Sequence, residues 1–170
     1  LGFLALDGNP IQDFSPLSSL PNLAGIHANR TGLRDLSPLA GLVKLTFLAL
    51  NENGISDISI LAALPNLNTV TLEINQLRDV SALAALTKLK QIDLRGNRID
   101  DISPLMELPR LQGAHVAYNP LGEQALREHV PALRRRGVKV TGVEPSNTPS
   151  GRTEPTPQPE PVATQPYPEA

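Results

Sequence analysis

The sequence contains no cysteine and no tryptophan, and it has only two tyrosines and three phenylalanines. Without cysteine, the chain has no disulfide, no thiolate ligand for a metal and no thiol nucleophile. An aromatic content of 3% leaves little material for stacking nucleic-acid bases. The core must therefore be built from aliphatic side chains, and chemistry that depends on cysteine is excluded.

The chain also lacks a strong charge imbalance and a long apolar segment. Its 15 basic and 17 acidic residues leave a net charge of -2, which gives no general attraction to nucleic acids or anionic membranes. No apolar run reaches the roughly 18 residues that a membrane helix needs, and no signal peptide is recognisable. We expect no nucleic-acid partner and no membrane insertion in this segment.

What the sequence does contain is a repeat with a step of 22 residues. The fourth and sixth positions of each unit are apolar, and this alternation predicts a short strand with one buried face. A single unit cannot bury its own apolar edge, so the units must stack into a solenoid with one parallel sheet. The repeats begin at Leu1, Leu23, Leu45, Leu67, Leu89 and Leu111. Because Leu1 already lies inside a unit and the only methionine is Met106, we expect further sequence upstream.

The second half of each unit contains polar columns between apolar ones. Position nine is asparagine in every unit but the second, where Thr31 replaces it, and a buried amide there can satisfy the turning backbone. Position 15 is serine, often followed by proline, which predicts a short helical turn with serine as its N-cap. Position 13 is an aspartate that we expect to accept backbone N–H groups in an Asx-type turn. The alternative is that these stacked carboxylates recruit Ca²⁺. The aspartates are Asp13, Asp35, Asp57, Asp79 and Asp101.

The period fails after Leu121. Residues 121–141 predict a helical cap over the last repeat, interrupted at Pro131 and ended by Gly137. Its basic run, Arg134 to Arg136 with Arg127 and Lys139, is typical of a solvated helix end, and the alternative is a patch for an acidic partner. Residues 142–170 contain eight prolines and predict a disordered tail. The predicted domains are therefore a repeat domain at 1–141 and a tail at 142–170.

These columns resemble the 22-residue leucine-rich repeats over about 120 residues. The segment DISPL at residues 101–105, with its near copies DLSPL from Asp35 and DFSPL from Asp13, resembles the bacterial internalin-type subclass. The resemblance implies an arc with one parallel concave β-sheet and short helical turns on the convex side. With the C-terminal helical cap and the disordered Pro-rich tail predicted from the residues, the expected fold is an α/β solenoid.

The resemblance also implies a function. Proteins of this subclass are non-enzymatic modules that bind a protein partner on the concave sheet, and they are often displayed at the bacterial surface. We therefore expect a cell-surface or extracellular location rather than a cytoplasmic one, and a monomer. A second 22-residue subclass, the phosphatase-regulator type of eukaryotic cells, has nearly the same repeat. The alternative function is thus a regulatory scaffold of a cytoplasmic enzyme.

The candidate ligand-binding surface consists of strand positions that point away from the leucine ladder. Phe47 and Tyr118 are large rings expected to face solvent, as binding anchors do. Glu73, Asp93 and Arg95 form a stripe of mixed charge that supplies polar specificity. The alternative is a solvated face on a purely structural spacer. The candidate ligand-binding residues are His27, Phe47, Thr71, Glu73, Asp93, Arg95, His115 and Tyr118.

Catalysis has little support in the sequence. His27 and His115 share a column four repeats apart, about 19 Å at strand spacing, which is too far for a common metal. Thr71, Asp93 and His115 are stacked neighbours, but this order puts the acid where the base of a catalytic triad must be. No phosphate-binding glycine loop is present. We expect no catalytic residue, no metal and no cofactor.

Overall fold

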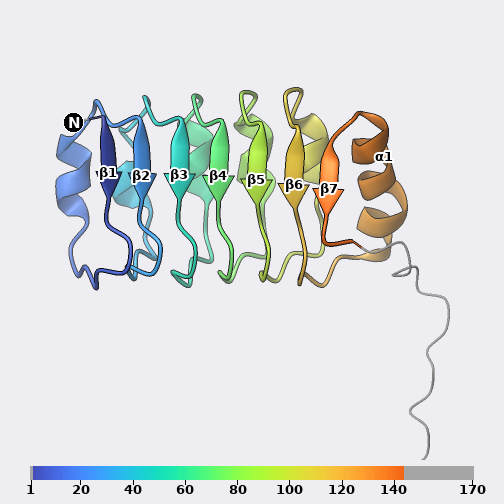
Figure 1. The fold of residues 1–170 in the computed structure, drawn as a ribbon, viewed down its shortest axis with the longest axis horizontal. Coiled ribbons are helices and arrows are strands. Elements are labelled where there is room, and N and C mark those ends of the chain that lie inside the picture. Colours follow the sequence, from blue (N-terminus) through green and yellow to red (C-terminus); the bar gives the residue numbers. More distant parts are fainter. Residues whose placement is uncertain (1, 144–170) are drawn as a thin grey trace, which may run out of the picture.

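The computed structural model describes residues 2–143, so Leu1 and residues 144–170, which make up nearly all of the predicted Pro-rich tail, lie outside the described residues. Seven strands lie side by side in chain order in one parallel sheet (Figure 1). Residues 22 positions apart pair with each other, as Phe3 does with Gly25 and Gly25 with Phe47. The strands are β1 (Phe3–Ala5), β2 (Gly25–His27), β3 (Phe47–Ala49), β4 (Thr69–Thr71), β5 (Gln91–Asp93), β6 (Gly113–His115) and β7 (Lys139–Thr141).

Between successive strands the chain returns through short 3₁₀ turns, which lie together behind the sheet in Figure 1. The arrangement confirms the predicted α/β solenoid. We call the side of the sheet that points away from these turns the sheet face. The turns are η1 (Ser15–Ser19), η2 (Ser37–Leu39), η3 (Ser59–Ala63), η4 (Ser81–Ala85) and η5 (Ser103–Glu107).

The core is a stack of aliphatic side chains between the sheet and the turns. Leu45, Leu48 and Leu67 are fully buried, like the corresponding residues of the neighbouring repeats. Burying one such side chain contributes about 2 kcal/mol relative to leaving it exposed. In the first repeat, Leu4 and Leu6 remain partly exposed, because β1 has a neighbouring strand on one side only among the described residues. Stability therefore comes from contacts between repeats.

A ladder of asparagine side chains joins consecutive repeats. The Asn75 amide nitrogen donates to the carbonyls of Leu50 and Leu72, at 3.0 Å each. Its amide oxygen accepts the N–H groups of Asn53 at 3.2 Å and Ile55 at 2.9 Å, which belong to the preceding repeat. Asn75 is only 7% exposed, so these bonds satisfy backbone groups that water does not reach. The predicted role of this column is confirmed.

Thr31 takes the asparagine position in the second repeat and makes only part of the hydrogen bonds that asparagine makes there. Its hydroxyl donates to the carbonyl of Ala28 at 3.0 Å, the equivalent of the bond from Asn75 to Leu72. The first repeat is joined instead by a backbone bond, from the N–H of Ile11 to the carbonyl of Thr31 at 3.2 Å. At this position the first two repeats are therefore linked by a backbone bond, whereas the later repeats are linked by bonds from an asparagine side chain.

The prediction that each serine caps its turn is wrong. The 3₁₀ turns begin on the serines, and the apolar residues at the cap positions, such as Ile58, make no side-chain cap bond. Instead, the aspartate two residues earlier accepts the serine N–H, as Asp57 does from Ser59 at 2.7 Å. The same bond forms at Asp13, Asp35, Asp79 and Asp101. The predicted Asx-type turn is thus confirmed.

The predicted helical cap is present, but Pro131 does not interrupt it. A π-helical turn, η6 (Ala125–His129), continues directly into α1 (Val130–Arg135). The wider turn accommodates a residue that has no N–H to donate. Gly137 ends the helix with a φ of 85°, and the N–H of Val138 donates to the carbonyl of Leu133 at 3.0 Å, as in a Schellman motif.

Two features of the cap were not predicted. The chain after Gly137 forms β7, which pairs in parallel with β6 and extends the sheet beyond the last repeat. Arg136 is more than a solvated helix end, because its guanidinium donates to the carbonyls of Met106 and Leu108, at 2.6 Å each. These bonds fasten the cap to the last 3₁₀ turn. Among residues 2–143, no helix is long and apolar enough to cross a membrane.

The asparagine ladder predicts a difference between two chemically identical substitutions. Asn75→Ala should lower the free energy of unfolding by about 3 kcal/mol, because several buried backbone groups lose their partners. Asn9→Ala should cost less than about 1 kcal/mol, since Asn9 is exposed and bonds only to Leu6 and Asp7 of its own repeat. Urea denaturation of both variants measures the difference, and equal losses would contradict the ladder's role.

The aspartate turns predict sensitivity to acid. Bonds from the backbone N–H groups of Ser15, Ser37 and Ser59 lower the pKa of Asp13, Asp35 and Asp57 below the ordinary value. A pKa that is lower in the folded chain than in the unfolded one means that the unfolded chain binds protons more readily. The free energy of unfolding should therefore hold at neutral pH and fall below about pH 4. Asp57→Asn keeps the acceptor oxygen and removes the titration, so its denaturation midpoint should depend less on pH than that of the parent.

Candidate functional site

The sheet face carries five of the eight predicted ligand-binding residues, and the other three follow directly after strands. The middle residue of each three-residue strand points into the core, so the first and third residues face outward. His27, Thr71, Asp93 and His115 are third residues of their strands, and Phe47 is a first residue. Glu73, Arg95 and Tyr118 lie on the loops after β4, β5 and β6. Five of the eight gather into two clusters, and Thr71, His115 and Tyr118 belong to neither.

The first is an aromatic cluster of Phe3, His27 and Phe47. The rings of His27 and Phe47 stack with their centroids 4.7 Å apart and an angle of 18° between their planes. The Phe3 ring lies 5.1 Å from His27 and 6.2 Å from Phe47. Gly25 lies between the two phenylalanines in the strand register, and a Cβ at this position would be 2.5 Å from the Phe3 ring. Glycine therefore leaves the space into which Phe3 leans.

Phe3 was not among the predicted site residues. The signal was nevertheless present, because Phe3 and Phe47 occupy the same column two repeats apart, with a glycine between them. At about 4.8 Å per strand, two phenylalanines across a glycine lie within reach of each other. The contact of both rings with His27 could not be predicted, because it depends on the direction in which each side chain turns.

The loops after the first strands carry a ladder of short polar side chains. The Asp7 carboxylate accepts the N–H of Asn29 at 2.7 Å, and the Asn29 amide oxygen accepts the N–H of Asn51 at 2.7 Å. Asn51 continues the ladder by accepting the N–H of Glu73 at 2.8 Å. Glu73 and Arg95 occupy the next positions of this column. Their longer, charged side chains bond to each other. The change of residue type marks where the charged part of the face begins.

The second is a charged cluster of Glu73, Asp93 and Arg95. The Arg95 guanidinium contacts Asp93 with its Nε at 3.0 Å and its Nη2 at 2.6 Å, and the same Nη2 lies 3.0 Å from Glu73. The hydrogen bond to Asp93 raises the pKa of Arg95, and the negative charges of both carboxylates add to the effect. Asp93 is the best shielded of the three, with 15% of its side chain exposed. The cluster holds Arg95 in one orientation, which pre-organises it for recognition.

Thr71, Asp93 and His115 lie in register on adjacent strands, but they do not form a catalytic relay. The Asp93 carboxylate is occupied by Arg95, and the Nδ1 of His115 lies 2.8 Å from the hydroxyl of Thr141 on β7. The Thr71 hydroxyl oxygen is buried without a hydrogen-bond partner among the described residues. Thr71, Asp93 and His115 therefore make no hydrogen bond to one another. Between residues 2 and 143, no three His, Asp or Glu side chains group closely enough to hold a metal ion.

The rim of the sheet face consists of the eighth residues of the repeats, which share a left-handed backbone. Glycine provides this conformation at two of the six positions. Ile74 adopts it with a φ of 54° although its side chain is β-branched, which makes the backbone strained. Tyr118 adopts it with a φ of 57° and leaves 87% of its surface exposed. The rim residues are Gly8, Arg30, Glu52, Ile74, Gly96 and Tyr118.

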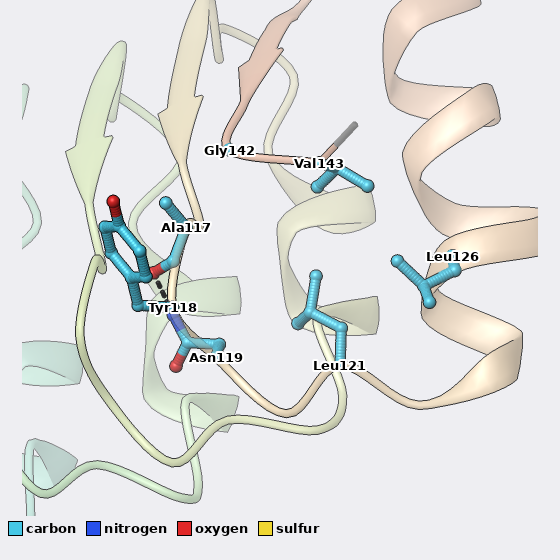
Figure 2. Close-up of a pocket in the computed structure, with 7 residues that line it drawn as sticks. All are labelled: Ala117, Tyr118, Asn119, Leu121, Leu126, Gly142 and Val143. Atoms are coloured by element: carbon cyan, nitrogen blue, oxygen red, sulfur yellow. Dashed lines mark hydrogen bonds between the residues drawn. The ribbon is translucent and has the colours of Figure 1, made fainter. Parts of the chain in front are cut away.

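A cavity of about 380 Å³ lies where the last repeat meets the cap. Figure 2 shows Tyr118 and Asn119 at one edge and Leu126 of the cap at the opposite edge, with Leu121 and Val143 between them. Its lining is mainly apolar and contains neither a charged side chain nor a histidine. The cavity therefore belongs to the junction of the cap, and only Tyr118 connects it with the predicted site.

Comparisons with known proteins agree with this architecture. The family model of leucine-rich repeats in two copies matches residues 43–85 and 65–107. An internalin (inlF) of Listeria monocytogenes is 29% identical with a TM-score of 0.74, over 82% of this chain and 40% of its own length. Internalin C2 of the same species is 32% identical with a TM-score of 0.61, over 72% of this chain and 64% of its own. A chain of the LRIM1/APL1C complex is 26% identical with a TM-score of 0.58, over 68% of this chain and 23% of its own. No curated protein matches at a significant level.

The chain thus spans less than two thirds of either internalin. The match supports an internalin-like repeat, and leucine-rich repeats form a protein-interaction fold whose members are generally not enzymes. What the longer proteins bind does not follow for this chain from the match alone.

The strained rim residue Ile74 predicts a stabilising substitution. Ile74→Asn should raise the free energy of unfolding by about 1 kcal/mol, because asparagine adopts the left-handed backbone at lower cost than a β-branched residue. Ile74→Val keeps the branched side chain and the strain, so its stability should match the parent within about 0.5 kcal/mol. Urea denaturation compares the variants, and an asparagine variant less stable than the parent would contradict the assigned strain.

Proposed function

We propose that this chain, which belongs to the leucine-rich repeat proteins of the internalin-like type, is a non-enzymatic module that binds a protein partner on its sheet face. The proposal assigns the contact to the aromatic cluster, the charged cluster and the exposed ring of Tyr118. We further propose that binding takes place at the bacterial surface or outside the cell. The proposed contact residues are Phe3 and the eight predicted residues, which are His27, Phe47, Thr71, Glu73, Asp93, Arg95, His115 and Tyr118.

The observation that carries the proposal is the grouping of aromatic rings on a face that needs none for its own stability. The fully buried apolar side chains are all aliphatic, and Phe14 packs against them partly buried, yet the other two phenylalanines lie on the sheet face. Phe3 is 51% exposed, and its ring contacts His27 and Phe47 rather than the core. Exposed aromatic side chains are typical of binding hot spots.

The arrangement of charge on the same face supports partner recognition rather than catalysis. Arg95 is fixed by two carboxylates, and its Nη1 has no partner among the described residues, which leaves donors for an incoming acceptor. Asp93 is bound by Arg95, and the Nδ1 of His115 contacts the Thr141 hydroxyl, so Asp93 does not orient His115 as the acid of a catalytic triad orients its base. A rigid sheet with fixed donors and exposed rings suits a flat protein surface.

Affinity capture with the full 170-residue chain as bait tests the proposal. The site variant changes Phe47, Glu73, Asp93, Arg95 and His115 to alanine. The control variant changes Gln12, Val43, Arg78, Asp100 and Glu107 to alanine, which removes a similar set of charges from exposed positions away from the sheet face. Circular dichroism and denaturation must first show that both variants fold.

We expect a protein from the cell surface or culture medium of the source organism that the parent and the control retain and the site variant loses. Loss of about 2 kcal/mol or more at a hot spot reduces affinity about thirtyfold or more. A partner recovered from the cytoplasm in the same pattern would instead support the scaffold of a cytoplasmic enzyme. If all three baits retain the same proteins or none, the sheet face is not a binding surface, as expected for a structural spacer.

A further inference from the structure

The aromatic cluster has a carboxylate at its edge whose charge is left unbalanced. The Oδ2 of Asp7 lies 3.5 Å from the Nδ1 of His27, and 42% of the Asp7 side chain is exposed. Among residues 2–143, no arginine or lysine lies within 4.0 Å of this carboxylate. His27 balances the charge only when it is protonated.

The neighbouring arginines on this face are already paired. The Nε of Arg30 lies 4.0 Å from Glu52 on the rim, and Arg95 is held by Glu73 and Asp93. The charged cluster thus contains its own cation, whereas the aromatic cluster contains a carboxylate and no permanent cation. This difference points to the charge that a ligand must bring.

We propose that the aromatic cluster and Asp7 form a subsite for an arginine side chain of the protein partner; this inference rests on the sheet-face binding proposed above. The faces of aromatic rings attract cations, and a guanidinium stacks on such rings while its N–H groups donate to a carboxylate. Phe3 and His27 expose 51% of the residue and 35% of the side chain respectively, so the cluster is accessible from solvent.

Other side chains fit the subsite less well. An apolar side chain that covered the rings would also shield Asp7 from water without pairing its charge, which costs free energy. An aspartate or glutamate would be repelled by Asp7. A cation satisfies the rings and the carboxylate together, and the planar guanidinium of arginine stacks on the rings while it donates to the carboxylate, which the compact ammonium of lysine does less well.

Gly25 provides a substitution that alters the cluster without touching its functional groups. A Cβ at this position would lie 2.5 Å from the Phe3 ring, which must then move away from Phe47. The Gly25 backbone is not left-handed, so an alanine is compatible with its conformation. Gly25→Ala should therefore disturb the rings while Asp7 and Phe47 remain in place.

The experiment is a titration of the ¹⁵N-labelled full chain with two small probes, followed by the amide signals of β2. N-acetylarginine methylamide carries the guanidinium, and N-acetylcitrulline methylamide has nearly the same shape without the charge. We expect the arginine probe to bind at least fivefold more tightly than the citrulline probe. Asp7→Asn, which keeps the acceptor for the Asn29 N–H, Phe47→Leu and Gly25→Ala should each weaken the arginine probe about threefold, as cation–π energies at exposed sites suggest.

Matched substitutions away from the sheet face serve as controls. Glu107→Gln removes an exposed carboxylate of η5, and Phe14→Leu removes a ring next to η1, so both should leave binding of the arginine probe unchanged. Equal affinity for the two probes would overturn the proposal, and so would arginine binding that persists unchanged in Asp7→Asn and Phe47→Leu. Absence of any shift in the β2 signals would overturn it as well.

The probe titration and the capture experiment fail independently. If the probe does not bind but the site variant still loses a partner that the control retains, the sheet face binds a protein without an arginine subsite. If the probe binds but the site variant retains every protein that the parent retains, the aromatic cluster binds a guanidinium and the proposed function is wrong. Both proposals stand only if both results are positive.

Discussion

The asparagine ladder is the constraint on which the rest of the structure depends. Each 22-residue repeat has backbone N–H and C=O groups that are buried away from water. The asparagine side chain of the next repeat bonds to these groups, as Asn75 does to the carbonyl of Leu50 and the N–H of Ile55. The aliphatic stack can close only if those groups are paired, because an unpaired buried donor or acceptor costs more than a hydrogen bond gains. Polar ladder and apolar core are therefore two parts of one stacking interaction.

The asparagine and apolar columns hold the repeats together. The strand residues that face outward are therefore not needed for packing between repeats. The sheet face can carry two phenylalanines at its first strands and three paired charges further along without loss of core packing. In the column of Asp7, Asn29 and Asn51, each side chain accepts a backbone N–H of the next repeat. Glu73 and Arg95 follow in the same column, but their side chains bond to each other. In this fold, residues that bind a partner can therefore occupy the columns that do not pack between repeats.

Most of the fold could be predicted because the repeat reports its own geometry: a constant 22-residue step sets the strand register, and alternation sets which side chains are buried. The parts that escaped prediction lie where periodicity ends or where side-chain direction decides. Residues of β7 pair with residues of β6 that are 26 positions earlier, so this pairing does not follow the 22-residue step. The prediction of a serine cap was wrong because each 3₁₀ turn begins on the serine itself. The contact of the Phe3 and Phe47 rings with His27 could not be predicted, because it depends on the direction of each side chain.

The most direct test of the account is amide hydrogen exchange of the chain alone and in complex with the partner recovered by capture. The account predicts that exchange slows on binding at β1–β5 and at the loops after β4 and β5, which carry the two clusters. The 3₁₀ turns η1–η5 should keep their rates, because they lie on the opposite side of the sheet. Slowing confined to those turns, or to η6 and α1, would contradict recognition by the sheet face.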